Sequence, residues 1–459
     1  KMYLKNGYKG KGAFIMKNTR RFASVATAAL LAACVAVPMT SAFSASAATA
    51  GTVTFTKADT KDAATHTYKA YKIFSGTVDE TGTLNNIQWA NTAKGADFLT
   101  ALKADGTIGD SFKDCDTAAA VAAILGAQEA DSTLLQNFAT FAASQKDNLT
   151  LVSADAAESI AVTEDGYYLF EDVTDLTDAT GAKTRYLVAQ VDASAGLDIT
   201  VKSSLPSVEK KIKENTKAVG YGTDPTETQD YVGTNYNDVA DYNIGDAVPF
   251  KLIGTMPSTL DDYKTYKYAF HDTLGKEFTA PAKEDIKVTC DGVDVTAQAT
   301  ITVTDGSGTA ASTVLVSFAD VKKLTGVTVT KDSIITVEYS AVLSKGAEIG
   351  LPGQQNEVYL SYSNNPNAGG EGETGNTPVD KAFTYELDIN KIDANTNATL
   401  IGAKFKLQAA DGDHADKWAK LSKNSDGNYT IDSWVDTEAD ATEFENPSGN
   451  TFAIVGLDS

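Results

Sequence analysis

Three polar residues occur on strand-like, otherwise apolar segments, and their side chains can react with one another. In 208-VEKKIK-213, Val208, Lys210 and Ile212 share one face of a strand because strand side chains alternate. The same alternation places Asp272 on the aromatic face of 266-YKYAFHDTL-274 and Asn356 on the apolar face of 355-QNEVYLSYSNNP-366. The sequence therefore predicts an amine, a carboxyl and an amide directed into one core.

Buried groups of these kinds can form a covalent bond. Burial disfavours charge, so the lysine would be a neutral amine nucleophile, and a protonated Asp272 could polarise the Asn356 carbonyl and relay protons. Attack on the amide would expel ammonia and leave a Lys–Asn isopeptide bond between the first and last strands of a domain. Such a bond would constrain the unfolded chain as a disulfide does. The alternative is that the Lys210 ammonium reaches past the sheet edge into water.

A second lysine repeats this pattern. In 385-YELDINK-391, the residues at 385, 387 and 389 share a face with Lys391, so we expect another inward-pointing lysine at the end of a first strand. The same alternative, an ammonium that remains in water, applies here.

Other reactive constellations are missing from the sequence. The three histidines, His66, His271 and His414, fall in separate segments, and no zinc pattern, serine triad, P-loop or dinucleotide motif occurs. Cys115 and Cys290 fall in different predicted domains, so a disulfide is not expected. We expect no metal, no cofactor and no turnover enzyme.

Composition and the N-terminal segment indicate a secreted protein. The chain has 459 residues, 42% of them hydrophobic, and a formal net charge of -22, which argues against nucleic acid or anionic membrane as a partner. From an expected start at Met16, a basic segment, an apolar segment and a small-residue end near 45–48 form a signal peptide. A lipoprotein box ending at Cys34 is the alternative, but the chain stays apolar after it.

The elements predict a mainly β fold of tandem immunoglobulin-like sandwiches. Short runs rich in Val, Ile, Thr and Tyr recur between Asp, Asn and Gly turns, as in 51–58, 166–173, 248–255, 313–318, 335–343 and 357–363. Capped helical patterns at 116–128 and 132–146 add some helix to the N-terminal domain. Linkers near 202–206 and 364–381 divide the chain into 1–47 (upstream residues and signal peptide), 48–204, 205–380 and 381–459, and we expect the last domain to continue past Ser459.

The chain resembles the backbone pilins of Gram-positive sortase-assembled pili, the SpaA-type and fimbrial major subunits. The resemblance extends over the mature chain and depends on 68-YKAYKIFSGTV with 87-IQWA, 242-YNIGDAVPFKLIGTMPSTLDDYKTYKYAFHDTLGKEFT, 356-NEVYLSYSNNPN and 385-YELDINKIDANTNATLIGAKFKLQ. It implies CnaA- and CnaB-type domains, with Lys210, Asp272 and Asn356 as the middle domain's bond-forming triad. Lys211 is the alternative donor if the register slips by one residue.

The resemblance also implies functional lysines elsewhere. Lys391 falls on the donor position of the third domain, whose acid and asparagine partners we expect beyond Ser459. Lys202, in 198-DITVKSSLP, corresponds to the pilin-motif lysine that is joined to the next subunit, although no Tyr-Pro precedes it. Exposed alternatives are Lys213 and Lys217, and Lys57 is a candidate donor in the first domain.

These observations support two functions of different classes. The first is the shaft subunit of a covalent cell-surface pilus, secreted and attached to the cell wall, with other copies of itself, a pilus sortase and tip or minor pilins as partners. The alternative is a monomeric wall-anchored adhesin that binds host glycans or matrix proteins.

Overall fold

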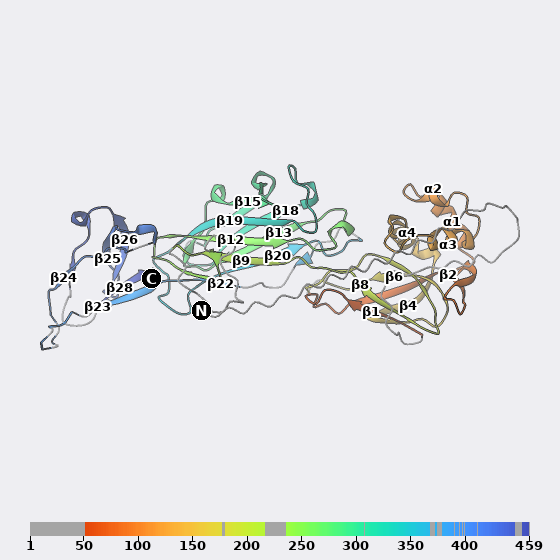
Figure 1. Cartoon of the computed structure of the whole chain (residues 1–459), viewed down its shortest axis with the longest axis horizontal. Coiled ribbons are helices and arrows are strands. Elements are labelled where there is room, and N and C mark those ends of the chain that lie inside the picture. The colour runs from red at the N-terminus through yellow and green to blue at the C-terminus, as the bar shows by residue number, and fades with distance from the viewer. Residues whose placement is uncertain are drawn as a thin grey trace, which may run out of the picture.

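The protein is an elongated row of β-rich bodies (Figure 1). The computed structural model describes residues 51–176, 180–215, 236–306, 308–367, 372–373, 379–389, 391–393, 395–396, 398, 400–410, 412–445 and 452–458. The N-terminal strands and helices lie at one end, the green and cyan strands in the middle, and the blue strands at the other end. The expected secretion segment lies outside the described residues.

The N-terminal body contains two sheets. One has the order β3-β2-β6-β7, with β4 also paired to β2, and the other has the order β5-β1-β8. The strands are β1 (Thr52–Lys57), β2 (Thr67–Val78), β3 (Leu84–Trp89), β4 (Thr150–Ala157), β5 (Ser159–Ala161), β6 (Gly166–Asp172), β7 (Leu187–Val191) and β8 (Leu197–Val201). Alternation along β1 and β8 buries Val53, Phe55, Ile199 and Val201 in a common core with β2 and β6.

Four helices cover one side of this body. They are α1 (Gly95–Ala104), α2 (Gly109–Phe112), α3 (Ala118–Gly126) and α4 (Thr133–Ser144), followed by the 3₁₀ turn η1 (Lys146–Asn148). The two predicted helices are confirmed as α3 and α4, which begin after the N-cap side chains of Thr117 and Ser132. The helices α1 and α2 were not predicted. None of the helices in the described part of the chain has the length and hydropathy needed to cross a bilayer.

The middle body is a two-sheet sandwich. One sheet has the order β10-β9-β12-β19-β15-β16 with β14 on β19, and the other has the order β11-β22-β20-β13-β18-β17 with β21 on β20. The strands are β9 (Val208–Lys213), β10 (Tyr236–Asn237), β11 (Val239–Asp241), β12 (Ala247–Thr255), β13 (Tyr268–Leu274), β14 (Phe278–Thr279), β15 (Lys287–Cys290), β16 (Val293–Asp294), β17 (Thr300–Thr304), β18 (Ser312–Phe318), β19 (Ile334–Leu343), β20 (Gln354–Tyr362), β21 (Gly372–Glu373) and β22 (Val379–Phe383). Short 3₁₀ turns connect them at η2 (Leu260–Asp262), η3 (Lys283–Asp285), η4 (Thr296–Gln298) and η5 (Val321–Lys323).

The strand that carries Lys210 faces this core as its alternation predicts. Val208, Lys210 and Ile212 are buried, whereas Glu209 and Lys213 are exposed. The strand β9 pairs antiparallel with β12, which places Lys210 opposite the buried Leu252. The register of β9 therefore directs the lysine into the sandwich.

The sandwich continues beyond β20. Because β22 pairs with β20 and with β11, the chain stays in the middle body to Phe383, three residues past the predicted boundary at 380. The strand β20 was expected to be the last strand of this domain, and that expectation is wrong.

The last body is a smaller β structure. A four-stranded sheet has the order β23-β28-β26-β25, and β24 pairs with β27. The strands are β23 (Tyr385–Ile389), β24 (Lys404–Phe405), β25 (Trp418–Lys423), β26 (Tyr429–Val435), β27 (Phe444–Glu445) and β28 (Phe452–Leu457), with 3₁₀ turns η6 (Gly412–His414) and η7 (Glu438–Asp440). The expected mainly β fold of tandem sandwich-like domains is confirmed.

Candidate functional site: a buried amine, carboxyl and amide

The middle body brings together the three residues predicted to react. Lys210 lies on β9 in one sheet, and Asp272 and Asn356 lie on β13 and β20 in the facing sheet. The three residues are 1%, 1% and 0% exposed, respectively. In the register of β13 and β20, Asp272 is opposite Val358 and Leu274 is opposite Asn356. The carboxyl and the amide are therefore on neighbouring strands and on the same inner face.

A fourth residue, Tyr339 on β19, connects this set. The Lys210 ammonium donates a hydrogen bond to Asp272 Oδ1, and the Tyr339 hydroxyl donates to Asp272 Oδ2. Asn356 Nδ2 donates to the Tyr339 hydroxyl at 2.9 Å, and Lys210 Nζ lies 3.4 Å from the same oxygen. Tyr339 is 4% exposed. The Asn356 amide therefore contacts the Asp272 carboxyl through the Tyr339 hydroxyl. The sequence had predicted a direct contact between the amide and the carboxyl.

Sequence reasoning missed Tyr339, although a signal was present. The segment 335-ITVEYSAVL-343 was recognised as a strand, and its alternation buries Val337, Tyr339 and Ala341 on one face. A tyrosine on a buried strand is ordinarily interpreted as core packing. Only the pairing of β19 with β12, which places Tyr339 opposite Phe250, shows that its hydroxyl lies near Lys210.

The Lys210 amine is buried among aromatic side chains. Lys210 Nζ lies 5.1 Å from the ring centroid of Phe250 and 5.9 Å from that of Tyr339. The Asn356 carbonyl oxygen is buried and has no hydrogen-bond partner among the described residues. A buried acceptor without a partner is costly, so the arrangement of this core does not satisfy the Asn356 carbonyl.

The neighbouring Lys211 is placed differently. Its side chain is 20% exposed, and its amine lies 2.5 Å from Asp238 Oδ1, a carboxylate that is itself 75% exposed. It pairs across the sheet with Lys251, on the face opposite to Lys210. The geometry therefore favours Lys210 over Lys211 as the reacting amine.

The two other candidate donors lack this environment. Lys391 is exposed, so the expectation that it points inward is wrong, and its role as a donor stays a prediction. The strand that precedes it, β23, ends at Ile389 and forms an edge of the sheet in the described part of the chain, and Leu387 on that strand is 43% exposed. Lys57 is half-buried and donates to the backbone carbonyls of Asp62 and Ala64 at 2.8 and 2.7 Å.

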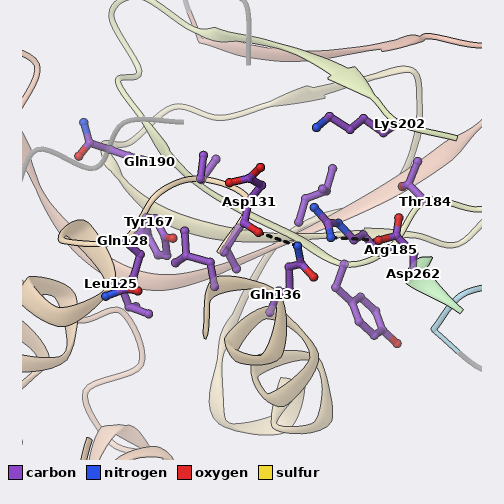
Figure 2. Close-up of a pocket in the computed structure, with 17 residues that line it drawn as sticks. Leu125, Gln128, Asp131, Gln136, Tyr167, Thr184, Arg185, Gln190, Lys202 and Asp262 are labelled. Atoms are coloured by element: carbon purple, nitrogen blue, oxygen red, sulfur yellow. Dashed lines mark hydrogen bonds and ion pairs between the residues drawn. The ribbon is translucent and has the colours of Figure 1, made fainter. Parts of the chain in front are cut away.

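Lys202 lies at a different site, on the surface near the junction of the first two bodies. It is exposed and follows the end of β8 directly. Figure 2 shows its side chain extending over a pocket that is also lined by Asp131, Gln136 and the segment 184–190. Within the described residues β7 pairs with β6 alone and lies at the edge of its sheet, so this pocket borders an edge strand.

Contacts between the two bodies hold one wall of this pocket. Arg185 Nη1 donates to Asp262 Oδ1 at 3.1 Å, as Figure 2 shows, and burial raises the pKa of Asp262 although the charge of Arg185 opposes that effect. Lys183 N donates to the Asn364 carbonyl at 2.7 Å, and Asn367 Nδ2 donates to the Thr184 carbonyl at 2.9 Å.

Of the alternatives to Lys202, Lys213 is exposed, and Lys217 lies outside the described residues.

A second buried polar set was missed by sequence reasoning. His66, 1% exposed, lies between Asp172 Oδ2 at 2.8 Å and Asp62 Oδ2 at 3.0 Å. Burial alone would lower the pKa of His66, but the hydrogen bonds and charges of the two carboxylates outweigh it and raise the pKa to about 9. Asp172 also accepts hydrogen bonds from Thr174 and from the backbone of Thr184. We refer to Asp62, His66 and Asp172 as the histidine cluster.

Three carboxylates also lie together near the last body. Glu214, Asp241 and Asp458 place one oxygen each within 4.8 Å of one another. Asn215 Nδ2 donates to Asp458 Oδ2 at 2.9 Å. Acidic clusters of this kind are common without an ion, so this geometry alone does not define a metal site.

The last body matches a known protein family. Residues 385–452 match the family model described as "SpaA: Prealbumin-like fold domain". A comparison with curated protein sequences found no match. The last body is therefore similar to the SpaA prealbumin-like domain over residues 385–452, which agrees with the tandem β architecture of the chain.

Solved structures similar to this chain are backbone pilins. The T6 backbone pilin of serotype M6 Streptococcus pyogenes is 16% identical over 89% of this chain and 81% of that chain, with a TM-score of 0.47. The major pilin SpaA of Corynebacterium diphtheriae is 14% identical over 89% and 84%, with a TM-score of 0.40. BcpA, the major pilin subunit of Bacillus cereus, is 13% identical over 88% and 97%, with a TM-score of 0.37.

Proposed function

We propose that this protein is the shaft subunit of a covalent cell-surface pilus, and that its middle domain makes an intramolecular bond between Lys210 and Asn356. The observation that carries the proposal is the buried set of Lys210, Asp272 and Asn356, joined by hydrogen bonds inside one sandwich. A purely structural core gains little from such a set, because apolar residues of similar volume are usually at least as stabilising. The presence of these polar residues in the core is explained if they react with one another.

The reaction would suit a subunit that carries tension. A bond from β9 to β20 crosses from one sheet of the sandwich to the other, and it encloses most of the middle domain in a covalent loop. Pulling on the chain could then not separate the two sheets at these strands. The described cysteines, Cys115 and Cys290, are free and buried, so this bond would provide the covalent constraint that disulfides provide in other extracellular proteins.

A different lysine would join one subunit to the next. A sortase-bound acyl group must be reached by the attacking amine, so the linking lysine has to be exposed. Lys202 meets that requirement, and it lies beside a pocket and an edge strand on which an extended segment of another subunit could bind. In this proposal the sortase, minor or tip pilins and other copies of the chain are partners, and the subunit belongs to the cell surface.

Two measurements test the proposal separately. The intact mass of the folded wild-type protein should be lower than the sequence mass by one ammonia for the middle-domain bond, and an unshifted mass would refute that bond. In cells that produce the pilus, blots of wall extracts should show a ladder of high-mass species. Lys202→Ala should abolish the ladder and Lys213→Ala, a change at another exposed lysine nearby, should leave it intact. A single band in the wild type would refute polymerisation.

A further inference from the structure

We infer that Tyr339 is a catalytic residue of the bond-forming reaction, in which its hydroxyl delivers a proton to the departing nitrogen of Asn356. This inference rests on the proposed function, since it assigns a role within the Lys210–Asn356 reaction. Its basis is an unbroken series of contacts that runs from Lys210 Nζ through Asp272 Oδ1 and Oδ2 and the Tyr339 hydroxyl to Asn356 Nδ2.

The chemistry of the leaving group requires a proton donor at this nitrogen. An amide nitrogen departs as ammonia only after it is protonated, because the unprotonated amide anion is too basic to leave. Among the described residues, the hydroxyl of Tyr339 is the hydrogen-bond partner of Asn356 Nδ2, at 2.9 Å. Asp272 has both oxygens engaged, one with Lys210 and the other with Tyr339, so its proton can reach Asn356 through the phenol.

The complete step balances without any further reactant. It starts after a proton has moved from the Lys210 ammonium to the Asp272 carboxylate, so that Lys210 is a neutral amine and Asp272 holds its proton on Oδ2. The Tyr339 hydroxyl has then turned from Oδ2 toward Asn356 Nδ2. The amine attacks the Asn356 side-chain carbonyl carbon, and one Nζ proton passes to Asp272 Oδ1. At the same time the Oδ2 proton passes to the Tyr339 oxygen, and the Tyr339 proton passes to Nδ2. The carbon–nitrogen bond of the old amide then breaks with its electron pair on nitrogen, the carbonyl re-forms, and ammonia leaves.

The carboxyl therefore acts at both of its oxygens, and the phenol returns to its original state. Asp272 receives a proton at the oxygen that faces Lys210 and gives one at the oxygen that faces Tyr339. No charge is left in the core after ammonia departs, which suits a site where all four residues are almost completely buried. A direct transfer from Asp272 to Asn356 would not use the phenol, and this difference makes the inference testable.

The main variant is Tyr339→Phe, which keeps the ring that packs 5.7 Å from Phe250 and removes only the hydroxyl. The full chain is synthesised in a cell-free system, and intact mass is measured over time to follow loss of ammonia. General acid catalysis contributes roughly 10²–10⁴-fold, so we expect bond formation to slow by about that factor. A wild-type rate in Tyr339→Phe would overturn the inference.

Tyr268→Phe is the matched control. It removes a tyrosine hydroxyl from the same core, where that hydroxyl donates to the Thr255 carbonyl at 3.0 Å and not to Lys210, Asp272 or Asn356. We expect its rate of bond formation to remain within a factor of about two of the wild type. A slowdown equal to that of Tyr339→Phe would mean that any buried hydroxyl loss impairs the core, which would overturn a specific role for Tyr339.

A second variant separates proton delivery from positioning. Fluorotyrosine incorporated at position 339 keeps the hydroxyl and the ring but makes the phenol more acidic. If the hydroxyl only positions Asn356, the rate should not change, and that result would overturn the inference; a changed rate supports it. If the wild type itself never loses ammonia, the proposed function fails instead, so the two failures can be told apart.

Discussion

Two buried polar sets in this molecule are built from similar groups and differ in the chemistry that is open to them. The middle domain contains an amine, a carboxyl, a phenol and an amide, whereas the histidine cluster of the N-terminal body contains an imidazole and two carboxylates. Both are almost completely buried, and both pair a cationic group with carboxylate oxygens. Only the first contains a carbonyl carbon that a neighbouring amine can attack with release of a neutral leaving group.

The comparison shows that burial of charge is not enough to make a reactive site. In the histidine cluster the carboxylates stabilise the imidazolium, and the pKa of His66 rises to about 9. The histidine cluster keeps its ionic groups, and the protonation of His66 changes reversibly with pH. In the middle domain the same kind of pairing lies beside an amide whose carbonyl oxygen is unpartnered, so the buried charge can be eliminated by forming a bond.

The largest expected effect comes from removing the middle-domain bond. Lys210→Ala should abolish the loss of ammonia and lower the free energy of unfolding by about 5 kcal/mol, as expected for a cross-link that closes a long loop. It also leaves Asp272 buried without the Lys210 nitrogen as a hydrogen-bond partner, which adds to the loss. Intact mass and thermal unfolding measure the two effects.

The control for that variant is Lys211→Ala. Because Lys211 is partly exposed and bonded to an exposed carboxylate, we expect a change within about 0.5 kcal/mol and an unaltered loss of ammonia. If Lys211→Ala abolished the ammonia loss and Lys210→Ala did not, the register inferred for β9 would be refuted.

The next largest effect is the dependence of the stability of the N-terminal body on pH. The folded pKa of His66, about 9, lies above its ordinary value near 6.5, so its contribution is fully present below pH 6.5 and is lost as pH rises through about 9. The shift corresponds to on the order of 3 kcal/mol. Thermal unfolding from pH 6 to 10 should show this loss in the transition of the N-terminal body, and His66→Gln should remove the slope. An unchanged slope in His66→Gln would assign the titration to another group.

A smaller effect is expected from Thr174, a neutral residue that contacts the histidine cluster. The Thr174 hydroxyl donates a hydrogen bond to Asp172 Oδ1. Thr174→Val keeps the shape but removes that bond and the one that the hydroxyl accepts from Thr67 N at 2.9 Å, so it should cost at least about 1.5–3 kcal/mol, the range for a hydrogen bond to a charged group. Urea unfolding of the wild type and the variant measures this difference, and a cost near zero would show that the carboxylate does not depend on this donor.

The reactive set could largely be predicted from the sequence, because strand alternation determines which face each residue occupies. Lys210, Asp272 and Asn356 each lie among apolar residues at period two, and each is buried as predicted. Alternation does not say which sheet lies opposite, or which side chains meet across the core. Tyr339 was therefore missed, since its part in the set depends on the packing of β19 against the facing sheet.

His66 and Lys391 also show that the alternation of residues along a strand does not predict tertiary contacts. His66 gave no signal in the sequence, because one partner, Asp62, lies in the same connection between β1 and β2, and the other, Asp172, is brought to it from the end of β6. For Lys391 the alternation in the sequence is as regular as for Lys210, but β23 ends before it at Ile389, and Leu387 on that edge strand is 43% exposed. Period two identifies a common face, and only tertiary packing decides whether that face is buried.

The smallest expected effect is that of Lys391→Ala in this chain. Because Lys391 is exposed, we expect the free energy of unfolding to change by less than about 0.5 kcal/mol, in contrast to the large loss for Lys210→Ala. The loss of one ammonia from the middle domain should also persist in the variant. Intact mass and thermal unfolding of the two lysine variants, measured side by side, test this contrast. A loss of several kcal/mol in Lys391→Ala would mean that this lysine is engaged in the folded protein in solution, and the difference drawn between the two strands would then be refuted.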